Sequence, residues 1–268
     1  MAAKLGILAG GGDLPRQIVS TCEESGRPFY VVALSGHAAP ELARHGSAAR
    51  LGAVGTILMR LREAAVEEVV MAGHVRRPTL AELRPDWRAA RFFAALGPKA
   101  LDPKVLGDDG LLRAIGELLR QEGFRPVGVQ DIVGGLLTPA GPIGRLAPDA
   151  PAQRDIEIGL AAARSHGSTD AGQAVVVRQG EVIAREDQAG TDALIDGVRP
   201  GAGAVLVKAA KPQQDLRFDL PAIGPETVLR AAAAGFAGIA VEAGRTLTLR
   251  RDEVAVAADR AGLFVVGV

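Results

Sequence analysis

Five charged side chains follow one short apolar run in the second half of the sequence. The run, residues 204–207, predicts a buried strand, and within about a dozen residues come two carboxylates and three cations: Lys208, Lys211, Asp215, Arg217 and Asp219. Cations neutralise phosphate oxygens, and carboxylates hold a divalent metal or a water. This pattern favours a site for an anionic substrate. The alternative is a solvated loop whose charges pair with one another.

Glycine or polar residues also follow three apolar segments in the first half. Residues 10–12 are glycines between a predicted strand (4–9) and a predicted helix (14–24), where backbone N–H groups can bind phosphate. His74 follows a predicted strand at 69–72, and Gln130 and Asp131 lie toward the end of another, 126–133. The carboxyl ends of parallel strands meet at one sheet edge, so we expect these residues to converge on a ligand. Tight-turn glycines and a structural histidine are the alternatives.

The three glycines do not form a dinucleotide-binding fingerprint. Pro15 stands where the third glycine of that motif belongs, and the predicted strand Phe29–Leu34 ends without an acid for a ribose. The histidines lack zinc-ligand spacing, and the sequence contains neither a Walker A motif nor a G-x-S-x-G elbow. A nucleotide-sugar dehydrogenase is therefore disfavoured.

The elements that must position these residues alternate between apolar strands and amphipathic helices. In the first half they predict an α/β fold with a Rossmann-like parallel sheet, whose clearest helix spans 109–122 behind a cap at Asp108 or Asp109. The second half, with a hairpin at Gln179-Gly180, predicts a mixed α+β domain. A Gly- and Pro-rich stretch separates them. We therefore expect an N-terminal domain at 1–134, a linker at 135–150 and a C-terminal catalytic domain at 151–268.

Composition excludes several classes of protein. Lys+Arg and Asp+Glu are both 31, which argues against nonspecific nucleic-acid binding, and 3% aromatic residues leave few surfaces for stacking bases. Hydrophobic residues make up 48%, which is typical of a globular protein. Because no apolar run reaches about 18 residues and no signal-peptide pattern occurs, we expect a cytoplasmic protein. The single cysteine, Cys22, suits a reducing compartment.

Arginines and aromatic residues gather in a chain that has few aromatics. Arg84, Arg88 and Arg91 recur at helical spacing beside three rings: Trp87, Phe92 and Phe93. A basic helix that carries aromatic side chains can lie on an anionic membrane or line an apolar groove. We therefore expect peripheral contact with a membrane or with an acyl substrate. An ordinary amphipathic surface helix is the alternative.

Taken together and in order, several segments resemble one family. They are Leu8-Ala9-Gly10-Gly11-Gly12-Asp13-Leu14-Pro15, Ala72-Gly73-His74-Val75, Gly107-Asp108-Asp109, Gly128-Val129-Gln130-Asp131, Gly190-Thr191-Asp192, Lys211-Pro212-Gln213-Gln214-Asp215, Gly224-Pro225-Glu226-Thr227 and Val241-Glu242-Ala243-Gly244. The sequence resembles the UDP-2,3-diacylglucosamine pyrophosphatases of lipid A biosynthesis, in the form unrelated to the calcineurin-like enzymes. The resemblance spans nearly the whole chain, and its most specific part is the loop ending in Asp219-Leu220-Pro221.

The resemblance implies a reaction and its setting. Water attacks the α-phosphorus of UDP-2,3-diacylglucosamine, giving UMP and 2,3-diacylglucosamine 1-phosphate (lipid X). The resemblance also implies dependence on Mg²⁺ and two domains that close on the lipid. With the arginine and aromatic residues near Trp87, we expect a cytoplasmic hydrolase in peripheral contact with the inner membrane. Whether the chain forms a homo-oligomer is left open at this stage, as is a non-catalytic sensor of nucleotide sugars or acyl lipids.

The charged residues support this chemistry independently. A carboxylate about 4 Å from a phosphate oxygen is repelled by roughly 4 kcal/mol at an effective dielectric of about 20. Asp215 and Asp219 therefore need Mg²⁺ or the lysines beside a diphosphate. We assign Asp219 as metal ligand or water base, Asp215 as supporting metal ligand, and Lys208 and Lys211 to the diphosphate. The residues expected to bind substrate are Gly11, Gly12, Asp13, Gly73, His74, Gln130, Asp131, Thr191, Asp192 and Gln213.

Overall fold

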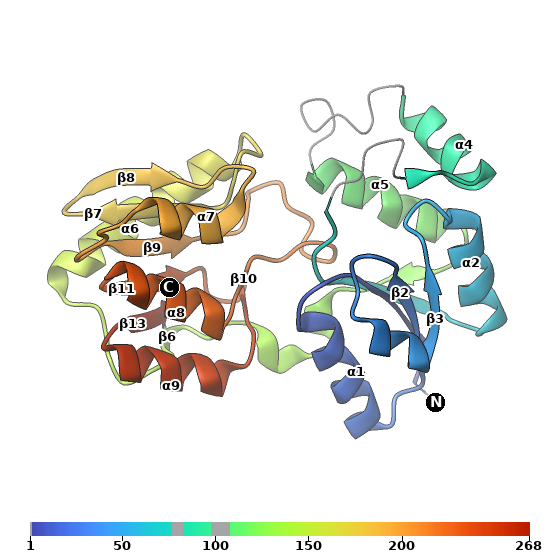
Figure 1. The fold of residues 1–268 in the computed structure, drawn as a ribbon, viewed down its shortest axis with the longest axis horizontal. Coiled ribbons are helices and arrows are strands. Elements are labelled where there is room, and N and C mark those ends of the chain that lie inside the picture. The colour runs from blue at the N-terminus through green and yellow to red at the C-terminus, as the bar shows by residue number, and fades with distance from the viewer. Residues whose placement is uncertain (1, 77–82, 98–107) are drawn as a thin grey trace. The chain divides into compact units, whose positions relative to one another are not determined.

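The computed structural model describes residues 2–76, 83–97 and 108–268, which form two units (Figure 1). Unit 1 comprises Met1–Gly134 together with Arg217–Asp219, and unit 2 comprises Gly135–Leu216 and Leu220–Val268. The chain therefore enters unit 2 after Gly134, returns to unit 1 for three residues of the charged loop, and re-enters unit 2 at Leu220.

A parallel sheet organises the described part of unit 1, with the strand order β3-β2-β1-β4-β5. Its strands are β1 Leu5–Ala9, β2 Phe29–Leu34, β3 Gly46–Ala49, β4 Glu68–Ala72 and β5 Arg125–Pro126. From β1 the chain builds outward to β2 and β3, and then returns to add β4 on the other side of β1. The sheet thus has a topological switch point between β1 and β4, and ligands of such sheets bind at the carboxyl ends of the strands there.

Helices cover both faces of this sheet (Figure 1). On one face, α2 and α5 pack against Leu8, Val32 and Val69 through a shared apolar cluster. Ile7 and Val31 alternate to the opposite face, which α1 covers with its buried side. The helical elements of unit 1 are α1 Leu14–Ser25, η1 Pro40–His45, α2 Val54–Glu63, α4 Trp87–Leu96, α5 Asp108–Gln121 and η2 Val129–Asp131.

The strand predicted at 126–133 is wrong. β5 ends at Pro126, and the following residues turn into the 3-10 helix η2. The physical reason is local, because the carboxylate of Asp131 accepts the backbone N–H of Gly128 at 2.9 Å and closes the turn. Gln130 folds back over Gly128, where a Cβ would collide with its amide. The short strand β3 had not been predicted.

The helix that was expected to carry Arg84 begins only at Trp87. Arg84 has a positive φ of 39° and precedes α4, since a residue before proline is disfavoured in helical conformation. Asp86 caps the helix by accepting the N–H of Ala89 at 2.8 Å. Arg84 is therefore not part of a helical stripe with Arg88 and Arg91.

Unit 2 is organised around a mixed sheet with the order β6-β13-β11-β9-β7-β8 in its described residues. The central strands β9, β11 and β13 are parallel, and the flanking strands run antiparallel to their neighbours. The sheet consists of β6 Gly141–Pro142, β7 Ala174–Arg178, β8 Glu181–Arg185, β9 Val205–Lys208, β11 Gly238–Val241 and β13 Phe264–Gly267. A separate parallel pair joins β10 Ala222–Ile223 to β12 Leu247–Thr248. The predicted hairpin is confirmed as β7–β8.

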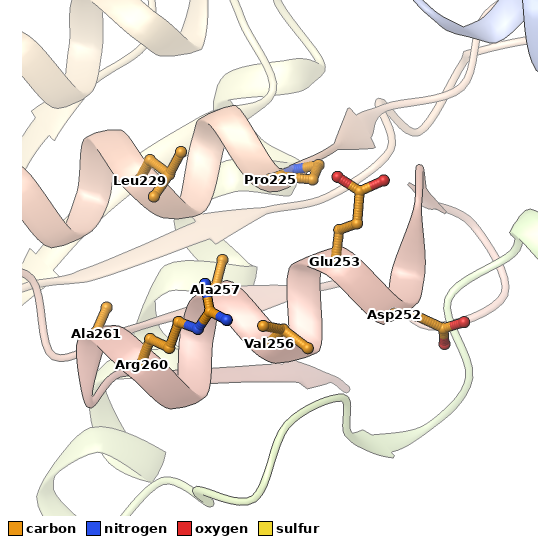
Figure 2. A pocket seen from close by; sticks show the side chains of 8 residues that line it. All are labelled: Pro225, Leu229, Asp252, Glu253, Val256, Ala257, Arg260 and Ala261. Carbon is orange, nitrogen blue, oxygen red and sulfur yellow. The ribbon is translucent and has the colours of Figure 1, made fainter.

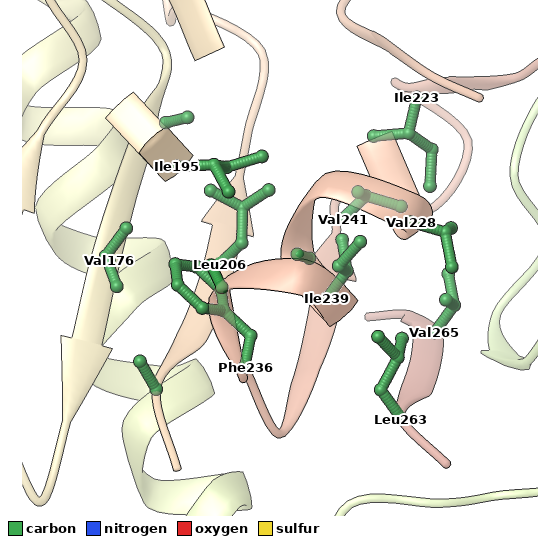
Figure 3. Packing of buried hydrophobic residues seen from close by; sticks show 14 of the residues in the cluster. Val176, Ile195, Leu206, Ile223, Val228, Phe236, Ile239, Val241, Leu263 and Val265 are labelled. Carbon is green, nitrogen blue, oxygen red and sulfur yellow. The ribbon is translucent and has the colours of Figure 1, made fainter. Parts of the chain in front are cut away.

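Unit 2 buries an apolar core on each face of its sheet. On one face, α7 Gly190–Gly197, α8 Pro225–Ala234 and α9 Arg251–Ala261 pack on Leu206, Ile239 and Val265 (Figure 3). On the other, α6 Ala150–Gly167 packs on the alternate side chains of β7 and β9. The fold class is confirmed, because unit 1 holds a parallel α/β sheet and unit 2 a mixed one.

Residues 135–150, predicted as a linker, belong to unit 2. They include part of η3 Gly134–Leu136 and all of β6, which pairs with β13. The hydroxyl of Thr138 donates to the carbonyl of Thr246 at 3.0 Å and lies 2.7 Å from the hydroxyl of Thr248. These bonds tie the stretch to the sheet of unit 2 from Thr138 onward. Across the described ranges, no helix combines the length and apolar character needed to cross a bilayer.

Candidate active site

The last residue of β9 is a buried lysine. Lys208 is 6% exposed, and its Nζ donates to Thr191 Oγ1 at 2.9 Å and to the carbonyl of Ala222 at 3.2 Å. The hydroxyl of Thr191 in turn donates to Glu186 Oε1 at 2.5 Å. A buried carboxylate thus compensates a buried ammonium through one hydroxyl and fixes the direction in which the ammonium points.

Glu186 was not among the predicted site residues. Its second carboxylate oxygen accepts the N–H of Gln173 at 2.7 Å, and its carbonyl lies 2.6 Å from Nε2 of His166. Gln173 Oε1 is buried and has no hydrogen-bond partner among the described residues. Glu186 lies just after β8 and Gln173 just before β7, so only the pairing of the hairpin brings them together. No spacing in the sequence could have signalled this.

Lys211 is the second buried cation at the end of β9. It is 9% exposed, and its Nζ lies 2.5 Å from Asp170 Oδ1. Its backbone N–H donates to Gln214 Oε1 at 3.0 Å, and the amide of Gln213 donates to the carbonyl of Gly167 at 2.9 Å. A solvated loop does not account for two buried lysines, because a charge is costly to remove from water.

Glu242, at the end of β11, anchors the start of this loop. Its carboxylate accepts the N–H of Ala210 at 3.0 Å and pairs with Arg164 of α6 at 2.9 Å. Glu242 is itself 6% exposed, so the loop is fastened to the interior of unit 2. Glu242 had also not been predicted as a site residue.

The two carboxylates of the loop fall in different units, Asp215 in unit 2 and Asp219 in unit 1. Both are half-buried. In unit 1 the ring of Phe218 packs on Gly116 of α5, where an added Cβ would collide with it. This contact holds the residue next to Asp219 in place. Among the described residues, no group of three or more His, Cys, Asp and Glu is arranged to hold a metal.

In unit 1, Gly11 and His74 meet at the switch point of the sheet. They form an antiparallel bridge, in which the N–H of Gly11 donates to His74 O at 2.8 Å and the N–H of His74 donates to Gly11 O at 3.0 Å. A Cβ added at Gly11 would lie 2.6 Å from the imidazole Cε1. Convergence of the loops after β1 and β4 is thus confirmed.

Two of the glycine N–H groups that were expected to bind phosphate donate to protein carbonyls instead. The N–H of Gly10 donates to Ala72 O at 2.7 Å, so this group and that of Gly11 are already bonded inside the protein. Gly10 and Gly11 instead permit close approach of the loop after β4, because a Cβ at Gly10 would lie 2.6 Å from His74 O. Gly12 and Gly73 have positive φ of 86° and 88°.

His37, in the loop after β2, adds a group that had not been predicted. Burial, and then the positive charges of Arg76 and His74, lower the pKa of His37 below its ordinary value. His37 therefore lies within electrostatic reach of Arg76 and His74.

Two other predicted residues of unit 1 have partners close in sequence. Asp13 pairs with Arg16 at 3.4 Å, and Asp131 closes the turn at Gly128. Gln130 Oε1 is buried without a hydrogen-bond partner in the described part of the chain. In unit 2, the carboxylate of Asp192 pairs with Arg230 at 3.3 Å, while the neighbouring Thr191 joins Lys208.

Two family models together cover nearly all of the sequence. Residues 4–136 match the LpxI N-terminal domain, and residues 139–266 match the LpxI C-terminal domain. The chain belongs to the LpxI family. It is 41% identical over 276 residues to a protein of Caulobacter vibrioides named UDP-2,3-diacylglucosamine pyrophosphatase LpxI, covering 99% of this chain and 97% of that protein. The resemblance drawn from the motifs is confirmed.

Each LpxI domain therefore carries one compact set of candidate residues. In the C-terminal domain, Thr191 connects Lys208 to Glu186. Lys211, three residues after Lys208, pairs with Asp170. The N-terminal domain brings together Gly11, Gly73 and His74. Two of the predicted residues, Asp192 and Asp13, form ion pairs at the surface with Arg230 and Arg16. These ion pairs do not connect them to either set.

Proposed function

We propose that this chain hydrolyses the diphosphate of UDP-2,3-diacylglucosamine, giving UMP and 2,3-diacylglucosamine 1-phosphate. Its near full-length similarity to a relative of that name supports the proposal. The observation that carries it is the pair of buried lysines at the end of β9, 6% and 9% exposed. Buried ammonium groups are costly, and a diphosphate that enters beside them gains direct charge neutralisation.

In the proposed reaction, a water oxygen attacks the α-phosphorus while its proton passes to Asp219. The bond between the α-phosphorus and the bridging oxygen breaks, and that oxygen leaves with the sugar phosphate. Lys208 and Lys211 neutralise the charge on the diphosphate as it redistributes in the transition state. Thr191 and Glu186 hold the Lys208 ammonium in position, which avoids reorganisation during the reaction.

We propose that Asp215 and Asp219, one carboxylate from each unit, are the protein ligands of a magnesium ion. Mg²⁺ keeps several waters and is usually held by one or two carboxylates plus substrate phosphates. When bound, the ion would neutralise diphosphate charge and lower the pKa of a bound water.

We propose that the switch point of unit 1 recognises the nucleotide end of the substrate. Close packing of Gly11 and Gly73 fixes the loop that carries His74, and Gly12 lies beside its imidazole. The side-chain oxygen of Gln130 has no hydrogen-bond partner within the described residues. A carbonyl acceptor suits the imide N–H of uracil. Asp13, Asp131, Thr191, Asp192 and Gln213 stay predictions as substrate-binding residues.

The aromatic side chain at the start of α4 is proposed to contact acyl chains or a membrane surface. Trp87 is 67% exposed, whereas Arg88 pairs with Glu122 at 2.7 Å. The proposal therefore depends on the exposed ring of Trp87 and not on the charge of Arg88. Replacing Trp87 by serine is expected to weaken binding to anionic vesicles about tenfold without lowering the melting temperature. The matched control is Met59→Ser on α2, a residue 45% exposed. Equal vesicle binding by the two variants would contradict the proposal.

Release of UMP from the acylated substrate tests the proposed function. We expect turnover with Mg²⁺, its loss on chelation by EDTA, and its recovery when Mg²⁺ is restored. A non-catalytic sensor would bind the same substrate and release no UMP under any of these conditions. That outcome would mean that the chain is a non-catalytic sensor and not an enzyme.

A further inference from the structure

A groove runs between α8 and α9 on the outer side of unit 2 (Figure 2). It has a volume of about 620 Å³, and most of the side chains that line it are apolar. Leu229 of α8 and Val256 of α9 lie in it and are 58% and 48% exposed. Exposed apolar side chains are ordinary when scattered singly, but two that share one groove indicate a surface that something covers.

Two exposed charges of opposite sign flank Val256 on α9, whereas Glu253 and Asp259 are already paired with Arg250 and Arg145. Asp252, Val256 and Arg260 follow one another at intervals of four residues, so they form one stripe on the helix, with the acid at one end and the base at the other (Figure 2). Both charged side chains are exposed, and neither has an ion-pair partner in the described part of the chain. The opposite side of α9 carries Val254 and Ala258, which are buried in the core.

We infer that this groove is the interface through which two copies of the chain associate. A two-fold axis through Val256 runs the two α9 helices antiparallel and sets Asp252 of each copy opposite Arg260 of the other. Such an isologous contact buries Val256 and Leu229 of both copies and pairs both sets of charges. A hydrocarbon chain in the groove would leave those two charges without partners, and this favours a second copy as the occupant.

Charge reversal with rescue tests the pairing. The full chain is studied by sedimentation equilibrium over a range of concentrations. Asp252→Arg and Arg260→Asp are each expected to raise the dissociation constant of the dimer about tenfold or more, because each sets like charges together twice. The double variant, which swaps the two charges, is expected to restore association. A wild-type chain that is monomeric at every concentration would overturn the inference, as would single variants that associate like wild type.

Cross-linking tests the position of the two-fold axis. Val256→Cys is expected to form a disulfide between two copies under mild oxidation. Ile158→Cys is the matched control, because this α6 residue is 38% exposed and lies on the helix that covers the other face of the sheet. The native Cys22 does not interfere, since it is buried and burial raises the pKa of its thiol. Equal cross-linking of both variants overturns the inferred interface.

A hydrocarbon occupant gives a different result. If Val256→Ser and Leu229→Ser weaken binding to detergent micelles while the charge reversals leave association unchanged, the groove binds lipid and the inferred dimer is wrong. Each of these measurements is independent of catalysis, so failure of the proposed hydrolysis would not affect them.

Discussion

Replacing Asp219 by alanine is expected to slow single-turnover hydrolysis by about 10²–10⁴-fold while leaving substrate bound. In the proposed reaction, the variant loses the carboxylate that acts as water base or metal ligand. It also loses a negative charge that repels the diphosphate, so affinity is expected to hold or to rise. Single-turnover kinetics and equilibrium binding of the acylated substrate, measured side by side, separate the two effects.

Asp196→Ala is the matched control for Asp219→Ala. Asp196 is an exposed carboxylate on α7 that pairs with Arg199 and Arg230, each at 2.8 Å, so its loss removes the same charge from the protein surface. The control is expected to react at the wild-type rate. If Asp219→Ala keeps more than about a tenth of that rate, Asp219 is not the base and the role passes to Asp215 or Asp192.

Replacing Lys211 by alanine is expected to lower kcat/KM about 100-fold or more, with KM and kcat both affected. In the proposed reaction, the ammonium neutralises charge on the diphosphate in the bound substrate and in the transition state, so its loss weakens substrate binding and slows the reaction. The change also leaves Asp170 without its buried partner, which lowers the stability of the fold. Rates are therefore compared well below the melting temperature of the variant.

The partner variant Asp170→Asn distinguishes charge from stability. It removes the carboxylate that pairs with Lys211 and keeps the ammonium itself. We expect it to retain most of the wild-type kcat/KM even though its melting temperature falls. Equal losses of activity in Lys211→Ala and Asp170→Asn would mean that the ion pair matters only for folding of the loop.

Elements with strong local signals could be predicted closely from the sequence. The strand Phe29–Leu34 and the helix Pro225–Ala234 match their predicted bounds, because an unbroken apolar run marks the first and proline and glycine mark the ends of the second. β3, with the sequence Gly-Ser-Ala-Ala, lacks β-branched and aromatic residues and so gave no signal. The strand expected through Gln130 failed because an aspartate three residues after a glycine closed a turn.

The candidate site could be predicted only where its residues follow one another in the chain. Lys208 and Lys211 were found from the charged loop. Glu186 supports Lys208 from 22 positions earlier in the chain, through a hydroxyl on α7. Gly10 and Gly11 looked like phosphate donors, but their N–H groups bond to the loop after β4. Contacts between distant segments decide such roles, and they appear only in the folded chain.

Hydrolysis in water labelled with heavy oxygen tests the central claim most directly. The substrate is UDP-2,3-diacylglucosamine with Mg²⁺, and the products are separated and weighed by mass spectrometry. Attack of water on the α-phosphorus places the heavy oxygen in UMP and leaves the sugar 1-phosphate unlabelled. Label in 2,3-diacylglucosamine 1-phosphate would contradict the proposed attack, and the absence of both products would contradict the proposed hydrolysis.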